Sequence, residues 1–212
     1  MQADFSVELG QDDPALEFPW SSSNPALRYF DLKNFPALIS QIPEAAQYPE
    51  LRLFLLRINS PEFPLQTAKC DVWHSQEITP EEEIFAAGHK FVSYMDLIFA
   101  DDVRRLSFSH HEQLAAQLCR MLQSTPEIKA SAEFVIRHCH FHPRQTATMQ
   151  TSSTSFTNGA EHNADSSQTG FCISAYVTGF GDDDRRASHQ WSIAISLLQY
   201  ALIQASHGEL FT

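Results

Sequence analysis

The chain has 212 residues, of which 43% are hydrophobic and 19% are charged, and it holds 16 Phe against 7 Gly. This composition is typical of a folded globular chain, and its length is enough to bury a core without disulfides or metals. The formal net charge of −12 argues against duplex nucleic acid and anionic membranes as partners, because both need basic groups that replace their counterions.

The four cysteines, Cys70, Cys119, Cys139 and Cys172, are widely spaced and form no CxxC pair. We therefore expect neither a zinc knuckle nor a redox motif, but buried thiols in a reducing compartment. The first residues carry no basic and apolar signal regions, and no window approaches the roughly 18 apolar residues of a membrane span. The sequence thus predicts a cytoplasmic protein with no membrane contact.

Residues 1–35 mix Pro14, Pro19 and Pro25 with aromatic residues. Prolines forbid long helices and aromatic side chains seek burial, so this stretch is predicted to be an irregular N-terminal arm lying on a single domain of residues 1–212. Two short helices are expected next, over 36–41 and 49–58, each beginning at a proline. A strand is the competing interpretation of the second.

Alternating patterns predict strands over 67–74, 90–100, 132–142 and 171–180. A short helix is expected from Thr79 to about Gly88, because Thr, Pro and three Glu residues suit a helix start. Longer helices are predicted over 109–123, where Ser109 and Glu112 suggest a capping box, and over 184–206. Residues 143–169 are rich in Ser, Thr, Asn and Gln and are predicted to be a flexible loop.

Two strand-to-helix junctions share the pattern FxDDxRRxS, at 99–107 and again 81 residues later at 180–188. Either a ββα unit is duplicated or the charge pattern coincides. In both cases we expect the aspartates of the pattern to have a structural role, since Asp accepts hydrogen bonds from the free N–H groups at a helix start.

Together these elements predict an α+β fold with a mainly antiparallel four- or five-stranded sheet and helices packed on one face. If residues 50–59 form a strand, the order becomes α-β-β-β-α-β-β-α, which is similar to that of the type III secretion chaperones. That resemblance implies a dimeric cytosolic protein that binds extended segments of its clients.

Three histidines near the end of the predicted strand 132–142 form the one local pattern suited to a metal. His138, His140 and His142 share a face of such a strand, because side chains alternate, and imidazole nitrogens at this spacing can bind Zn²⁺ or Fe²⁺. Candidates for a further ligand are His74, Asp71, Asp96 and His162. The alternative is a solvent-exposed strand end, where polar histidines alternate with packed residues.

No motif for nucleotide binding, hydrolysis or zinc proteolysis is present in the sequence. We therefore expect a non-enzymatic protein-interaction or chaperone-like module, which could form a homodimer, and which binds an unidentified protein partner through a sheet face or strand edge. The alternative is a metal-binding protein or metal-dependent enzyme that uses the histidine cluster.

Overall fold

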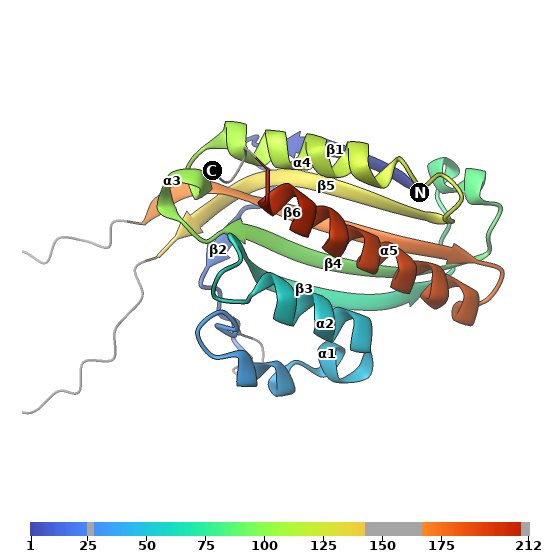
Figure 1. Cartoon of the computed structure of the whole chain (residues 1–212), viewed down its shortest axis with the longest axis horizontal. Helices are drawn as coiled ribbons and strands as arrows, with labels where there is room; N and C mark the ends of the chain where they lie inside the picture. Colours follow the sequence, from blue (N-terminus) through green and yellow to red (C-terminus); the bar gives the residue numbers. More distant parts are fainter. Residues whose placement is uncertain (25–27, 143–166, 209–212) are drawn as a thin grey trace, which may run out of the picture.

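The computed structural model describes residues 1–24, 28–142 and 167–208, which form one sheet with helices (Figure 1). The strands are β1 (Gln2–Glu8), β2 (Leu16–Phe18), β3 (Leu65–Ser75), β4 (His89–Phe99), β5 (Ala130–Phe141) and β6 (Gln168–Gly181). The α-helices are α1 (Pro43–Gln47), α2 (Pro49–Ile58), α3 (Asp102–Arg105), α4 (Phe108–Leu122) and α5 (Asp184–Ser206), and the 3₁₀ helices are η1 (Pro36–Gln41) and η2 (Pro80–Phe85).

The sheet has six strands and is mixed. Its order is β1-β5-β6-β4-β3, and β2 also pairs with β5. The pairs β3–β4, β4–β6 and β5–β6 are antiparallel, whereas β1 and β2 run parallel to β5. The predicted α+β class is confirmed, but the expected sheet of four or five mainly antiparallel strands is corrected.

The correction comes from the N-terminal residues, which were expected to be an irregular arm. In β1, Ala3 and Phe5 pack against the core while Asp4 is exposed, the alternation of a strand with one buried face. The prolines that suggested irregular structure all lie after β1, in the segment around β2. Prolines therefore marked the end of the strand and gave no information about the residues before it.

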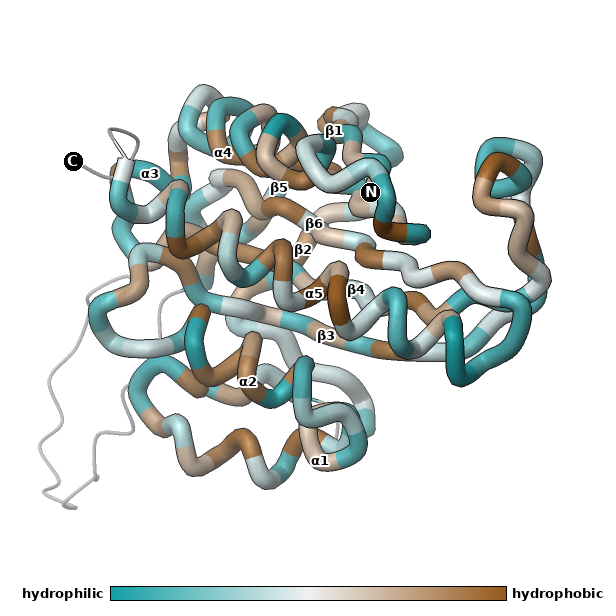
Figure 2. Tube along the Cα trace, turned by 45° about the vertical axis from the view of Figure 1, so that its right-hand side comes forward, coloured by the Kyte–Doolittle hydropathy of each residue, from teal (hydrophilic) through white to brown (hydrophobic). Residues whose placement is uncertain are grey.

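Helices α2, α4 and α5 cover one face of the sheet (Figure 1) and enclose the main core with it. Apolar residues recur along α4 and α5 between hydrophilic ones (Figure 2), and in α5, the helix predicted over 184–206, the stripe of Trp191, Ile195, Leu198 and Leu202 is buried. Residues 49–58 are helical, so the element order on which the resemblance to type III secretion chaperones depended is not formed. None of the helices in the described ranges is both long enough and apolar enough to cross a membrane.

The two FxDDxRRxS corners both start helices. The Asp101 side chain accepts a hydrogen bond from the backbone N–H of Arg104, and the Asp183 side chain accepts one from that of Arg186. The structural role expected for these aspartates is confirmed. The capping residue is the first Asp of the pattern in one corner and the second in the other, and the proposed duplication stays a prediction.

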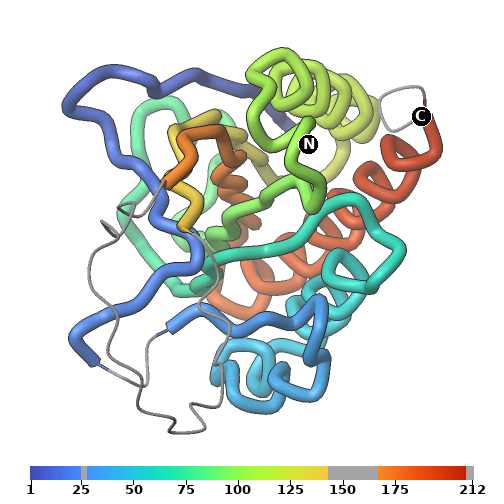
Figure 3. The backbone as a smooth tube through the Cα atoms, turned by 90° about the vertical axis from the view of Figure 1, so that its left-hand side faces the viewer, coloured from blue at the N-terminus to red at the C-terminus, as the bar shows by residue number. Residues whose placement is uncertain are grey.

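The N-terminal segment lies on the other side of the sheet. Figure 3 shows it in blue, on the side away from α5 in red. Leu16, Phe18 and Tyr29 pack there on Ile98 and Phe141. The predicted loop 143–169 falls largely outside the described residues, although Gln168 and Thr169 already belong to β6.

Candidate functional site

The sheet face opposite the helices is the candidate site, because the described chain covers it mainly near its two ends. The N-terminal segment packs over one end, around Ile98 and Phe141. At the other end Phe85 of η2 stacks on Phe180, with ring centroids 4.1 Å apart and planes 10° from parallel. Polar side chains from four strands occupy the area between.

Asp96 is the most deeply buried acid of this area, at 1% exposed. Its two carboxylate oxygens accept hydrogen bonds from the Tyr94 hydroxyl, at 2.5 Å, and the Ser174 hydroxyl, at 2.7 Å. Burial raises the pKa of the Asp96 carboxyl, while the two hydrogen bonds oppose that rise. The same burial, with Asp96 beside it, raises the pKa of Tyr94. Asp96 thus holds a proton more readily than an exposed aspartate does.

Arg137 forms a second polar group next to the first. Its Nε and Nη2 donate to the same oxygen of Glu8, at 2.9 and 2.8 Å, and its Nη1 donates to the Tyr176 hydroxyl at 3.2 Å. Burial acts to lower the pKa of Arg137, but the hydrogen bonds to Tyr176 and Glu8 raise it overall. The guanidinium stays charged and ties β1, β5 and β6 together.

A groove of about 750 Å³ runs beside these groups, between β1, the strands β5 and β6, and η2. The charged side chains that line it are all carboxylates: Asp4, Glu81, Glu82 and Glu133. Glu82 pairs with Lys90 at 2.8 Å. The other three are exposed and form no ion pair with any residue that the structure describes. Three carboxylates of the groove therefore lack an ion-pair partner among the described residues, while the N-terminal ammonium of Met1, also in the lining, donates to the Thr125 carbonyl.

Aromatic and hydroxyl groups complete the groove. Phe5, Phe85 and Tyr176 line it together with Thr178, which is 7% exposed. The Thr178 hydroxyl makes no hydrogen bond within the described ranges of the chain. A hydroxyl that lines open space and has no partner in the described chain can bond to a ligand or to water.

The three histidines of the predicted metal site lie at the end of β5 but turn to different neighbours. His138 stacks on Phe171 with centroids 5.6 Å apart. His140 Nδ1 lies 3.1 Å from the Thr169 hydroxyl, and His142 Nε2 contacts the Glu17 carboxylate. Within the described ranges, no group of three His, Cys, Asp or Glu side chains is placed to hold a metal ion.

The residues considered as a further metal ligand are also engaged elsewhere. His74 faces Asp184, with Nδ1 and Oδ1 3.6 Å apart, and packs edge-on against Phe91. Asp71 accepts a hydrogen bond from the Val72 N–H, and Asp96 belongs to the network with Tyr94. His162 lies outside the described residues. The metal site stays a prediction from sequence.

The sequence contained one indication of the polar sheet face opposite the helices. Phe91, Met95 and Leu97 lie on the side of β4 that packs into the main core, which leaves Tyr94 and Asp96 on the other. An aspartate at a strand position between apolar neighbours is uncommon and indicates a polar partner. One partner, Ser174, lies 78 residues away in the chain, and only the pairing of β4 with β6 reveals it.

No protein family model, no curated protein and no solved structure matches this chain.

Proposed function

We propose that the chain is a non-enzymatic binding module that holds a positively charged segment of a partner protein in the groove between β1 and η2. The observation that carries this proposal is the lining, whose charged side chains are all carboxylates and of which Asp4, Glu81 and Glu133 have no ion-pair partner in the described chain. Lysine and arginine side chains would supply the missing charges.

The shape and chemistry of the groove support a peptide segment. Its floor is made of strands, and its aromatic lining of Phe85 and Tyr176 offers ring faces to which cationic side chains bind. The Thr178 hydroxyl offers a hydrogen bond at the floor. The net charge of −12 would also accelerate the approach of a basic partner.

A binding experiment tests this proposal. We expect a fluorescent 12-residue peptide that alternates Lys or Arg with Leu or Tyr to bind the full chain, and a peptide with Glu in place of each basic residue to bind far more weakly. Glu133→Gln and Asp4→Asn should each weaken binding about two- to fivefold, as expected for exposed ion pairs worth up to about 1 kcal/mol. Fluorescence anisotropy over a range of salt concentrations measures both effects.

Glu112→Gln is the matched control, because Glu112 is an exposed acid on α4 and does not line the groove. It removes the same charge from the whole molecule and should change the affinity less than twofold. Equal affinity for the basic and acidic peptides, or an equal effect of Glu112→Gln and Glu133→Gln, would contradict the proposal.

We also propose that the chain forms a homodimer through β3, the edge strand of the sheet. In the first half of this edge, side chains bond to the backbone groups that another strand would need. The Thr67 N–H donates to Asn59, and the carbonyls of Ala68 and Leu65 accept from Trp20 and Lys33. The second half pairs with no described strand on its outer side, and Trp73 there is 39% exposed. A second copy that pairs with β3 would cover this unpaired half of the strand and the Trp73 side chain.

The free thiols of the four cysteines support a cytoplasmic location for this module.

A further inference from the structure

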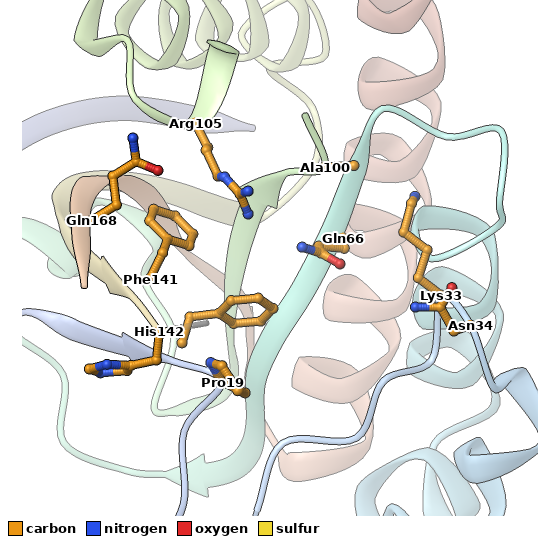
Figure 4. Close-up of a pocket in the computed structure, with 10 residues that line it drawn as sticks. Pro19, Lys33, Asn34, Gln66, Ala100, Arg105, Phe141, His142 and Gln168 are labelled. Carbon is orange, nitrogen blue, oxygen red and sulfur yellow. The ribbon is translucent and has the colours of Figure 1, made fainter. Parts of the chain in front are cut away.

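A second cavity, separate from the groove, opens at the other end of the sheet (Figure 4). It has a volume of about 510 Å³ and lies among the ends of β3, β4, β5 and β6, the short helix α3 and the N-terminal segment. It shares no lining residue with the groove beside η2. The apolar part of its wall comes from Phe18, Pro19 and Phe141.

A buried amide faces this cavity. Gln66 of β3 is 4% exposed, and its side chain makes no hydrogen bond with any described residue. Figure 4 shows Gln66 and Arg105 directed toward the same space from opposite sides. The amide oxygen and nitrogen are not enclosed by protein, so both can be reached from the cavity. The cavity therefore has on its wall an amide that can bond to a ligand or to water.

The charge of the cavity wall is opposite to that of the whole chain. Although the protein has 26 acidic and 14 basic residues besides histidine, the part of the lining that the structure describes contains Arg105, Lys33 and His142 and no Asp or Glu. Asp102 and Glu17, which pair with Arg105 and His142, lie outside the lining. An anion in the cavity would meet cations and no carboxylate on the wall.

Arg105 is held in place over the cavity. Its guanidinium carbon lies 4.8 Å from the centre of the Phe141 ring, a cation–π contact that fixes the plane of the group. Helix α3 can approach β6 because residue 170 is glycine: a Cβ atom there would lie 2.4 Å from the Arg105 carbonyl oxygen. The close packing of α3 thus positions the side chain.

We propose that this cavity binds a small organic carboxylate, with Arg105 bonding to the carboxylate and Gln66 bonding to a neighbouring polar group of the ligand. The planar guanidinium matches a carboxylate or a phosphate in geometry. The carboxylate is favoured over the phosphate because Lys33 is already engaged. Its ammonium donates to the carbonyls of Ser60, Phe63 and Leu65, at 3.1, 2.6 and 2.9 Å. One guanidinium then suits a monoanion better than a phosphate dianion.

Titration calorimetry of the full chain tests this inference with benzoate, benzamide and inorganic phosphate. We expect benzoate to bind at least about tenfold more tightly than neutral benzamide, a difference of about 1.4 kcal/mol, and more tightly than phosphate. An acetylated tetrapeptide ending in Phe, compared with its C-terminal amide, identifies the source of the carboxylate. Tighter binding of the free acid than of benzoate assigns the site to a chain end, and the reverse order assigns it to a free small molecule.

Variants locate the binding. Arg105→Gln should weaken benzoate binding about tenfold or more, as the loss of a charged hydrogen-bond donor requires. Its control is Arg104→Gln, in the same helix, because Arg104 pairs with Asp101 and does not line the cavity. Gln66→Glu should also abolish binding by adding a carboxylate to the wall, and it provides the test if Arg105→Gln fails to fold.

Thermal unfolding confirms that each variant is folded before its affinity is interpreted. Three results would overturn the inference: no benzoate binding at about 50 mM, which corresponds to less than 2 kcal/mol, equal binding of benzoate and benzamide, or equal effects of Arg104→Gln and Arg105→Gln. Peptide binding in the groove beside η2 uses other residues, so either proposal can fail without the other.

Discussion

Among single residues, Asp96 shows how the sheet face opposite the helices differs from the face that the helices cover. Its neighbours Met95 and Leu97 pack into the main core, while Asp96 itself is buried among hydroxyl groups. A carboxylate in such a place must either be ionised with weak solvation or keep a proton, and burial raises its pKa toward the second state. This makes Asp96 a source of pH-dependent stability.

The sign of that dependence follows from the raised pKa. Since the folded state binds the proton more tightly than the unfolded state, the stabilisation is complete below pH 3.8, the ordinary pKa of aspartate, and is lost as pH rises through the folded-state pKa. Asn at position 96 cannot ionise. We therefore expect the free energy of unfolding of Asp96→Asn, relative to that of the wild-type chain, to increase as pH rises over this range. Urea unfolding at a series of pH values measures the difference.

Asp71→Asn serves as the control, because Asp71 is an exposed acid of β3 on the same sheet. This substitution removes an equal charge outside the hydrogen-bonded group of Asp96, Tyr94 and Ser174, so a gain equal to that of Asp96→Asn would show that the effect does not arise from the buried site. A constant difference between Asp96→Asn and wild type, or a difference that falls as pH rises, would contradict the expectation.

Among the elements, α5 and β6 pack so closely that a glycine is required between them. A Cβ atom at Gly179 would lie 2.1 Å from the backbone nitrogen of Trp191 and 2.4 Å from the carbonyl oxygen of Ala187. Both atoms belong to the helix backbone and cannot move without shifting α5. The buried Trp191 side chain, which donates to the Ser93 hydroxyl at 2.8 Å, depends on the same contact.

We therefore expect Gly179→Ala to lower the free energy of unfolding by about 3 kcal/mol or more, beyond the 1–3 kcal/mol usual for overpacked cores. Gly88→Ala is the matched substitution, since no atom lies within 4 Å of the added Cβ there. It should be neutral or stabilise slightly by restricting the unfolded chain. Chemical denaturation of both variants measures the effects, and similar values for the two would show that α5 does not pack on β6 as described.

At the scale of the whole molecule, the acidic residues are unevenly distributed. The charged side chains in the described lining of the groove beside η2 are carboxylates, whereas those in the described lining of the cavity beside α3 are basic. Two surfaces of opposite charge therefore lie at opposite ends of the sheet. The net charge of −12 describes neither of them.

The proposed homodimer belongs to this scale. We expect sedimentation equilibrium to show a dimer whose dissociation constant rises at least about tenfold in Trp73→Glu, because a charge at the joined edge lacks a partner. Val103→Glu is the control, since Val103 is a 76% exposed apolar residue on α3, which follows the end of β4 that pairs with Leu65 and not the part that pairs with Trp73. A wild-type chain that stays monomeric at about 100 µM, a concentration far above the dissociation constants of specific dimers, would contradict the proposed dimer.

The sequence by itself determined the local elements. Helix α5 matched its prediction over 184–206 because its apolar stripe and its aspartate cap depend only on neighbours within a few turns. Helix α4 began at Phe108 rather than Ser109, since Ser107 starts the helix and the Ser109 hydroxyl accepts from Gln113 instead of forming the expected capping box. Such errors are small because the competing contacts are local.

The tertiary structure alone decided the sheet edge and the groove and cavity that carry the two proposals. Ala3, Phe5 and Val7 alternate with polar residues, so the local pattern of β1 allows a strand, but only the pairing with β5, about 130 positions away, shows that it is one. Gln66 and Arg105 line one cavity only because β3 and α3 come together in space, and Asp4 and Glu81 line one groove only because β1 and η2 do. Side-chain patterns report which face of an element is buried, but contacts between distant elements arise from packing that no local pattern encodes.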